Sequence, residues 1–218
     1  METTLIHLKT NDSEFSNNVF INCPFDETYI NNLLKPILYI TVKNRLNPRL
    51  ALEISDSGQI RLEKITDILK ECKYSIHDLS IVKSEKVGDF ARMNMPFELG
   101  IDYGLRNSGS TLYKDKQFLI LEANRYDYMR AISDINGFDI KAHYNDTQKI
   151  FRNLYSWLSE TLKISKQPPP LKTFNDYTEF NASLFEEKLS EFSSEEIALD
   201  YINSIPIPEY IQEIRERI

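Results

Sequence analysis

The feature that most constrains the fold is a regular alternation, along residues 19–162, between short apolar runs and longer segments with helical periodicity. The runs with the composition of strands cover residues 19–21, 50–54, 74–79, 118–121 and 138–143. The remaining segments repeat apolar side chains every three or four residues, as helices that cover one face of a sheet do. The predicted helices cover residues 26–38, 60–73, 96–106, 125–135 and 150–162.

Strands that alternate with helices form parallel sheets, and their crossover connections are right-handed. We therefore predict an α/β fold: a flavodoxin-like five-stranded parallel sheet in the order 2-1-3-4-5, with helices on both faces and a small C-terminal helical appendage. Such sheets bind ligands at the carboxyl ends of their strands, at the switch point between strands 1 and 3. We also expect Pro36 to kink or divide the first helix.

The chain divides by composition into four parts. Residues 1–17 are polar and are predicted to form a flexible arm, and residues 18–165 hold the alternating pattern. Residues 166–173 contain three consecutive prolines, which cannot continue a helix and predict a stiff linker. Residues 174–218 are acidic, with apolar stripes at helical spacing. This last part is predicted to be a helical extension, either an appendage or a segment that binds a partner.

The net charge of −7 and the pI of about 5.1 argue against nonspecific binding to nucleic acid or to an anionic membrane, because both need clustered Lys and Arg. We see no signal peptide at the N-terminus and no apolar run long enough to span a membrane. The cysteines, Cys23 and Cys72, lack metal-ligand spacing and are interpreted as reduced thiols of a cytoplasmic protein. The scattered histidines argue against a zinc site, so no metal is expected.

Polar and acidic residues follow the strands that flank the predicted switch point. Asn22, Pro24 and Phe25 follow the first strand, and Asp78 ends the third. Glu98 lies in the predicted first turn of the helix after that strand. Two carboxylates at one sheet edge can take different roles in cleaving the bond to a sugar. One faces the anomeric carbon, while the other binds or polarises the leaving group. The alternative interpretation is that Asp78 caps a turn and that Glu98 interacts favourably with the helix dipole.

Four other residues complete the predicted substrate-binding set. Asn94 is a natural N-cap for the helix that begins near Pro96, and its amide could still face a ligand. Asp56 and Ser57 follow the second strand and could bind a ribose or a base, or form only a turn. Arg61 is a candidate partner for a phosphate.

Three segments together resemble the nucleoside 2-deoxyribosyltransferase-like proteins and the bacterial TIR-like domains. They read VFINCPFD at 19–26, IHDLS at 76–80 and NMPFELGI at 94–101, and the resemblance extends over residues 19–145. The resemblance implies a flavodoxin-like sheet and cleavage of an N-glycosidic bond. It further implies that Glu98 is the nucleophile, or the glutamate required to release nicotinamide from NAD, and that Asp78 contacts the substrate.

The long charged segment between Leu79 and Asn94, and the C-terminal extension, depart from the compact transferases. These departures favour a larger nucleotide substrate. We therefore expect an NAD glycohydrolase acting as a bacterial anti-phage immune effector, with NAD as substrate and no cofactor, and with a homo-oligomer or an activating partner protein. The alternatives are a non-catalytic module that binds a nucleotide signal, a nucleoside deoxyribosyltransferase and an assembly scaffold.

Overall fold

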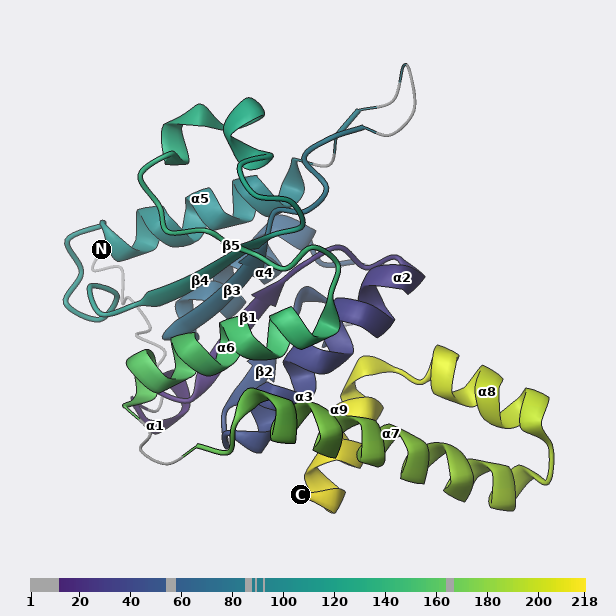
Figure 1. Ribbon diagram of the computed structural model, residues 1–218. Coiled ribbons are helices and arrows are strands. Elements are labelled where there is room, and N and C mark those ends of the chain that lie inside the picture. Colours follow the sequence, from purple (N-terminus) through teal and green to yellow (C-terminus); the bar gives the residue numbers. More distant parts are fainter. Residues whose placement is uncertain (1–11, 54–57, 85–87, 89, 92, 164–166) are drawn as a thin grey trace.

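The structure is a computed structural model that describes residues 12–53, 58–84, 88, 90–91, 93–163 and 167–218. A parallel five-stranded sheet lies at its centre, in the order β2-β1-β3-β4-β5 (Figure 1). The strands are β1 (Asn18–Asn22), β2 (Asn47–Arg49), β3 (Tyr74–Asp78), β4 (Gln117–Glu122) and β5 (Lys141–Ala142). The predicted fold class and strand order are therefore confirmed.

The two strands at the centre of the switch point are buried along their whole length. Every residue of β1 and of β3 is buried, as expected for parallel strands covered on both faces. Their register pairs Val19 with Tyr74 and Asn22 with His77. Val19 and Phe20 belong to different apolar clusters, since successive side chains of a strand point to opposite faces. This register fixes which polar side chains meet at the carboxyl edge.

The helices that follow the strands cover both faces of the sheet. One face packs against α3 (Lys35–Lys43) and α6 (Thr147–Leu162), and the other against α4 (Arg61–Lys70) and α5 (Asn94–Arg106). Before α3, the chain passes through the short helix α2 (Glu27–Tyr29) and the π-helical turn η1 (Ile30–Leu34). We expected Pro36 to kink or divide the first helix. The structure instead has the π-helical turn, which ends at Leu34, and Pro36 is the second residue of α3.

Three C-terminal helices pack onto the face that carries α3 and α6 (Figure 1). They are α7 (Pro170–Phe192), α8 (Glu195–Ser204) and α9 (Ile207–Arg217). Tyr210 and Ile214 are fully buried in the same apolar cluster as the sheet. The helices therefore complete the main core. The predicted linker is shorter than expected, because Pro170 starts α7, a position where proline needs no amide hydrogen.

At the N-terminus, the short helix α1 (Asp12–Phe15) precedes β1, and Phe15 is buried. Only residues 12–17 of the predicted flexible arm belong to the described part of the chain, and the rest of the arm lies outside it. Within the described part, the prediction of a loose arm is wrong for Phe15, whose ring centroid lies 6.4 Å from that of Tyr113.

The predicted second strand was misplaced. The strand is β2 (Asn47–Arg49), and the chain turns into a 3₁₀ helix, η2 (Ala51–Glu53), directly after Leu50. The Glu53 carboxylate accepts hydrogen bonds from the Leu50 amide, at 3.2 Å, and from Arg49 Nε, at 2.8 Å. A local side-chain acceptor therefore takes the amide that a longer strand would need for its ladder.

The predicted helix over 125–135 is instead a loop with two 3₁₀ turns, η3 (Tyr128–Arg130) and η4 (Ser133–Ile135). The buried Glu122 carboxylate, at the end of β4, accepts hydrogen bonds from the amides of Tyr126 and Tyr128. These bonds hold Tyr126 in a left-handed conformation, with φ of 71°, which a continuous helix excludes.

The helix that carries Glu98 also begins earlier than predicted. Asn94 is its first residue, and Met93 occupies the N-cap position without a side-chain hydrogen bond. The prediction that Asn94 is the N-cap is therefore wrong, and Glu98 lies one turn into the helix rather than in its first turn. No helix in the described ranges is both long enough and apolar enough to cross a membrane.

Candidate functional site

A cavity of about 240 Å³ lies at the carboxyl edge of the sheet, on the side of α4 and α5. Its lining brings together Asn22, Cys23, Pro24, Phe25, Asp26, Arg61, Asn94, Met95 and Glu98. Most of the predicted site residues thus meet in one place, although they come from three separate segments of the chain. Asp56 and Ser57 lie outside the described residues.

Glu98 is the electrostatically unusual group of this cavity. Its side chain is 6% exposed, and no residue in the described part of the chain hydrogen-bonds its carboxylate. Burial raises its pKa from 4.5 to about 7, and the Arg61 guanidinium opposes this rise. A carboxyl group whose pKa lies near neutral pH, facing a cavity, is suited to chemistry rather than to stability.

The start of α5 is tied to the sheet through Asn22. The Asn22 side-chain amide donates hydrogen bonds to the Met95 carbonyl, at 3.0 Å, and to His77 Nδ1, at 3.1 Å. Since His77 accepts through Nδ1, its proton lies on Nε2, which donates to Asp102 Oδ2 at 3.1 Å. His77 therefore has a buried, supporting role.

Asp102 is the centre of a buried polar network that extends from this anchor. It also accepts a hydrogen bond from the Ser75 hydroxyl, and Lys116 Nζ lies 3.0 Å from Asp102 Oδ1 as an ion pair. Lys116 in turn donates to the carbonyls of Leu69 and Cys72 at the end of α4. Although burial alone raises the pKa of Asp102, the hydrogen bond from His77 and the nearby Lys116 lower it below its ordinary value.

Sequence reasoning missed this network. The signal that could have found it is spacing on α5, where Met95, Leu99 and Asp102 recur every three or four residues and are all buried. An aspartate on the buried stripe of a helix needs a cationic or hydrogen-bonding partner. Lys116, directly before β4, is that partner.

Asp78 has different surroundings from those of Glu98. It is fully buried, its Oδ1 accepts the Ser80 amide at 3.0 Å, and its Oδ2 lies 3.0 Å from His143 Nε2. The Asn145 amide donates to His143 Nδ1, so the His143 proton lies on Nε2 and is donated to Asp78. Asp78 is absent from the described lining of the Glu98 cavity, and its predicted contact with substrate stays a prediction.

Ser80, His143 and Asp78 do not form a nucleophile-activating triad. The Ser80 hydroxyl and the Asp78 carboxylate both approach His143 at Nε2, each at 3.0 Å. Activation of a serine requires an unprotonated nitrogen facing the hydroxyl, while the acid contacts the other nitrogen. Because Nε2 already carries the proton, His143 cannot take one from Ser80.

Cys23 is held in the thiol form. It is buried, and its pKa is raised well above the ordinary value by burial and by the carboxylates of Asp78, Asp26 and Glu98. A thiolate is the reactive form of cysteine, so Cys23 is a poor candidate for a nucleophile. The result also means that Asp78 and Glu98 both lie within electrostatic reach of this thiol.

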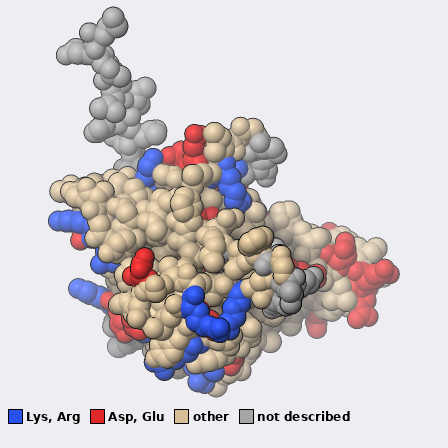
Figure 2. Space-filling model, turned by 90° about the horizontal axis from the view of Figure 1, so that it is seen from above, with Lys and Arg blue, Asp and Glu red and all other residues tan. Residues whose placement is uncertain are grey.

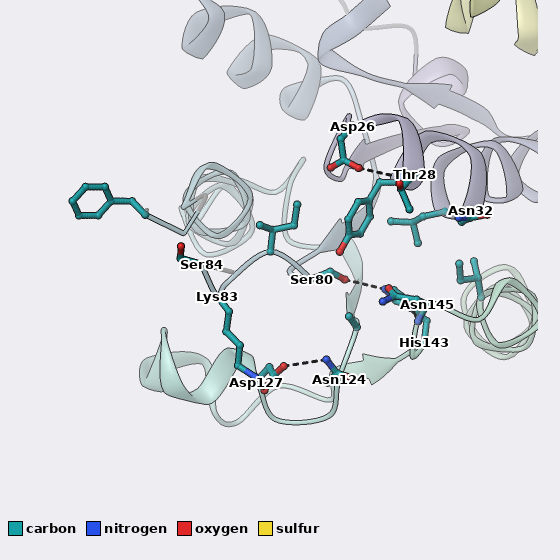
Figure 3. A pocket seen from close by; sticks show the side chains of 16 residues that line it. Asp26, Thr28, Asn32, Ser80, Lys83, Ser84, Asn124, Asp127, His143 and Asn145 are labelled. Atoms are coloured by element: carbon teal, nitrogen blue, oxygen red, sulfur yellow. Dashed lines mark hydrogen bonds and ion pairs between the residues drawn. The ribbon is translucent and has the colours of Figure 1, made fainter. Parts of the chain in front are cut away.

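A second and larger cavity, of about 850 Å³, opens above the switch point and shares Asp26 with the first (Figure 3). In the described residues, no three His, Cys, Asp or Glu side chains gather as metal ligands. No protein-family model, curated protein or solved structure matches this chain. The geometry of the two cavities is therefore the basis for inferring a function.

Proposed function

We propose that this protein is an N-glycosidase that cleaves the bond between ribose C1′ and the base of a nucleotide, with NAD as the substrate. The observation that carries the proposal is Glu98, a buried carboxyl group with a pKa of about 7 that faces a cavity at the sheet edge. Glycosidic cleavage passes through a transition state with positive charge at C1′, which a nearby carboxylate stabilises.

In the proposed reaction, the ionised Glu98 carboxylate faces C1′ of the ribose. The C1′–N bond breaks and its electron pair leaves with nicotinamide, which departs as a neutral molecule because its ring nitrogen was cationic in NAD. A water oxygen then forms the new bond at C1′ and releases its proton to Glu98 or to solvent. The reaction needs no acid to protonate the leaving group.

The charges around the small cavity support a base that is cationic. Asp26 and Glu98 are both acidic, and Arg61 is the cation in the described lining. Two carboxylates favour a pyridinium ring over a neutral base, and the Arg61 guanidinium is suited to the phosphate attached to the same ribose. The half-buried ring of Phe25 offers a surface against which a flat base can stack.

The test is release of free base, measured by chromatography after incubation of concentrated protein with NAD and, separately, with deoxynucleosides. We expect nicotinamide from the wild type and none from Glu98→Gln. Glu63→Gln is the matched control, because Glu63 is an exposed glutamate of α4 outside the cavity.

Each other result points to a named alternative. Base released from deoxynucleosides instead of NAD would indicate a deoxyribosyltransferase. Full turnover by Glu98→Gln would contradict the proposal. Stabilisation by NAD without any product would favour a module that binds a nucleotide signal. The anti-phage role suggested by the sequence resemblance stays a prediction, and NAD loss in cells expressing the protein would test it.

A further inference from the structure

The larger cavity is built by the segments that follow β1, β3, β4 and β5, so it lies over the switch point of the sheet (Figure 3). Its volume, about 850 Å³, falls within the range of small-molecule sites. The polar side chains that matter most here are Asp26, Asn32, Ser80, Asn124, His143 and Asn145. Of this lining, the proposed glycosidase chemistry uses Asp26 alone, which both cavities share.

We propose that the larger cavity is a second binding site, for a neutral nucleoside: a flat base joined to a sugar that bears hydroxyl groups. The inference goes beyond the proposed function and does not depend on it, because Glu98 lines only the smaller cavity. Its support comes from the charge of the lining, from its hydrogen-bonding groups and from its apolar side.

The charge of the lining disfavours phosphorylated ligands. Among the described residues that line the cavity, Lys83 is the cation, and its ammonium already pairs with Asp127 at 2.7 Å. Helix N-termini, which otherwise attract phosphate, are capped here by carboxylates. Asp26 accepts the Tyr29 amide at the start of α2, and Asp146 accepts the Gln148 amide at the start of α6.

The hydrogen-bonding groups of the wall are held in place before any ligand arrives. The buried His143 ring is fixed by the Asn145 amide on one side and by Asp78 on the other. The Ser80 hydroxyl lies 3.0 Å from His143 Nε2, whose proton faces Asp78 and Ser80. Because the Ser80 oxygen accepts the proton of His143 Nε2, the hydroxyl hydrogen of Ser80 remains available for donation to a ligand.

The chain next to this wall is held in an unusual backbone conformation. Tyr144 and Asn145 are consecutive residues with φ of 54° and 55°, in the left-handed region that non-glycine residues seldom adopt. This conformation brings the Asn145 amide back to His143 and places the Asn145 side chain at the cavity, where Figure 3 shows it beside His143. Such strain is retained where a site needs a fixed geometry.

The remaining groups match the two halves of a nucleoside. The exposed side-chain amides of Asn32 and Asn145 present donors and acceptors, as the edge of a base requires. Asn124 Nδ2 donates to Asp127 Oδ2 at 3.2 Å, and the same amide keeps its oxygen and a second N–H for a ligand. The Asp26 carboxylate can accept hydrogen bonds from sugar hydroxyls, a role that acidic residues take in nucleotide-binding α/β folds. Leu33 and Ile150 give the same cavity an apolar side.

The test is calorimetric titration of the Glu98→Gln protein, which prevents turnover in the other cavity, with adenosine, inosine, cytidine and uridine. We expect at least one nucleoside to bind with a dissociation constant below 1 mM, roughly the affinity of a few good hydrogen bonds plus a buried ring. The corresponding 5′-monophosphate should bind more weakly, because Lys83, the cation among the described lining residues, is already paired with Asp127.

Variants assign the binding to the cavity. Asn124→Ala and Asn145→Gly should each weaken binding about tenfold, the loss of one or two hydrogen bonds. Glycine is chosen at 145 because it keeps the left-handed backbone. Thr28→Trp, at an exposed position of the lining, should block the cavity. Asn136→Ala, at an exposed asparagine outside the lining, is the control and should bind normally.

Asn94→Trp separates this site from the smaller cavity, since Asn94 lines only that one. Nucleoside binding that survives Asn94→Trp and is lost in Thr28→Trp supports the proposal. The reverse pattern would overturn it, and so would tighter binding of monophosphates, equal binding of ribose alone, or no heat from any nucleoside at 5 mM, about five times the expected limit.

Discussion

At the scale of single residues, the main contrast is between two buried acids on α5. Glu98 faces a cavity without a hydrogen-bonding partner among the described residues, and burial raises its pKa. Asp102, one helical turn further on, has partners on several sides, and its pKa is lowered. Two carboxylates on one helix therefore have pKa values shifted in opposite directions, because their hydrogen-bonding and charged partners differ.

The pKa of Glu98 predicts how activity depends on pH. If the ionised carboxylate is needed at C1′, then the initial rate at low NAD concentration should rise between pH 5.5 and pH 8, with a midpoint near pH 7. The initial rate of nicotinamide release, measured at several pH values across this range, tests the prediction. A rate that falls with rising pH would mean that the protonated form of Glu98 acts instead.

Glu98 should also lower stability at neutral pH. Its carboxyl titrates at about 7 in the folded protein against 4.5 ordinarily, so the folded state holds the proton more tightly. The free energy of unfolding therefore falls as the pH rises from 4.5 to 7, by about 3 kcal/mol from this group, and stays level above pH 7.

Urea unfolding of the Glu98→Gln variant tests this predicted pH dependence of stability. The variant should be more stable than the wild type at pH 8, and its advantage should shrink as the pH is lowered toward 4.5. Glu63→Gln, on the exposed side of α4, should show no such trend. A Glu98→Gln protein that is less stable than the wild type at pH 8 would contradict the raised pKa.

The buried pair of Lys116 and Asp102 predicts a large loss of stability. Lys116→Met leaves the Asp102 charge buried without its cation and should cost about 3–5 kcal/mol in urea unfolding. Adding Asp102→Asn to the same protein should recover part of the loss, because the charge is then removed. Lys114→Met, at an exposed lysine nearby, is the control, and an equal effect there would refute the argument.

At the scale of elements, acidic side chains decide where several helices and strands begin or end. Glu53 ends β2 early, and Glu122 prevents a helix after β4. Asp26 and Asp146 cap the helices that start beside the larger cavity. Each of these carboxylates accepts hydrogen bonds from backbone amides at the end of an element.

Asp146 gives the clearest test of this role. Its side chain accepts the Gln148 amide at 2.8 Å and the Lys149 amide at 3.4 Å, and the residue is exposed. Asp146→Ala should therefore cost about 1 kcal/mol of stability, whereas Asp146→Asn should cost little, since asparagine caps equally well. Thermal unfolding of both variants measures the difference. Equal losses would show that charge, and not capping, is what matters.

At the scale of the whole molecule, the C-terminal helices are part of the core and also project an acidic end. The Tyr39 ring of α3 packs against Tyr177 and Phe180 of α7, with centroids 5.3 and 5.5 Å apart. Buried Lys35 donates to the Ile202 carbonyl of α8 at 2.9 Å. Figure 2 shows acidic side chains gathered at the far end of these helices, on the right of the molecule.

Two isoleucines of these helices provide a matched comparison. Ile214 of α9 is fully buried, and Ile197 of α8 is 53% exposed. Ile214→Ala should cost about 2–5 kcal/mol, because it opens a cavity in the shared core. Ile197→Ala should change stability by less than about 0.5 kcal/mol. Equal small losses in urea unfolding would mean that the C-terminal helices are a detachable appendage, as the sequence had suggested.

The sequence by itself determined the order of the five strands in the sheet, because apolar runs that alternate with amphipathic helices mark a parallel α/β fold. It also predicted that Glu98 lies near five residues with which it shares the small cavity, since carboxyl ends of neighbouring parallel strands must meet at one edge. They are Asn22, Pro24, Phe25, Arg61 and Asn94. Local patterns alone do not fix the ends of elements: they predict Asn94 as a cap and residues 50–54 as a strand, whereas Met93 is the N-cap and β2 covers Asn47–Arg49.

Only the tertiary structure decided which partners surround each polar group. The pairing of Asp102 with Lys116, of Asp78 with His143, and of Asn22 with Met95 joins residues far apart in the chain. So does the packing of Tyr210 and Ile214 onto the main core. These contacts depend on the register of the sheet and on how helices fill its faces, and no local propensity encodes either of them.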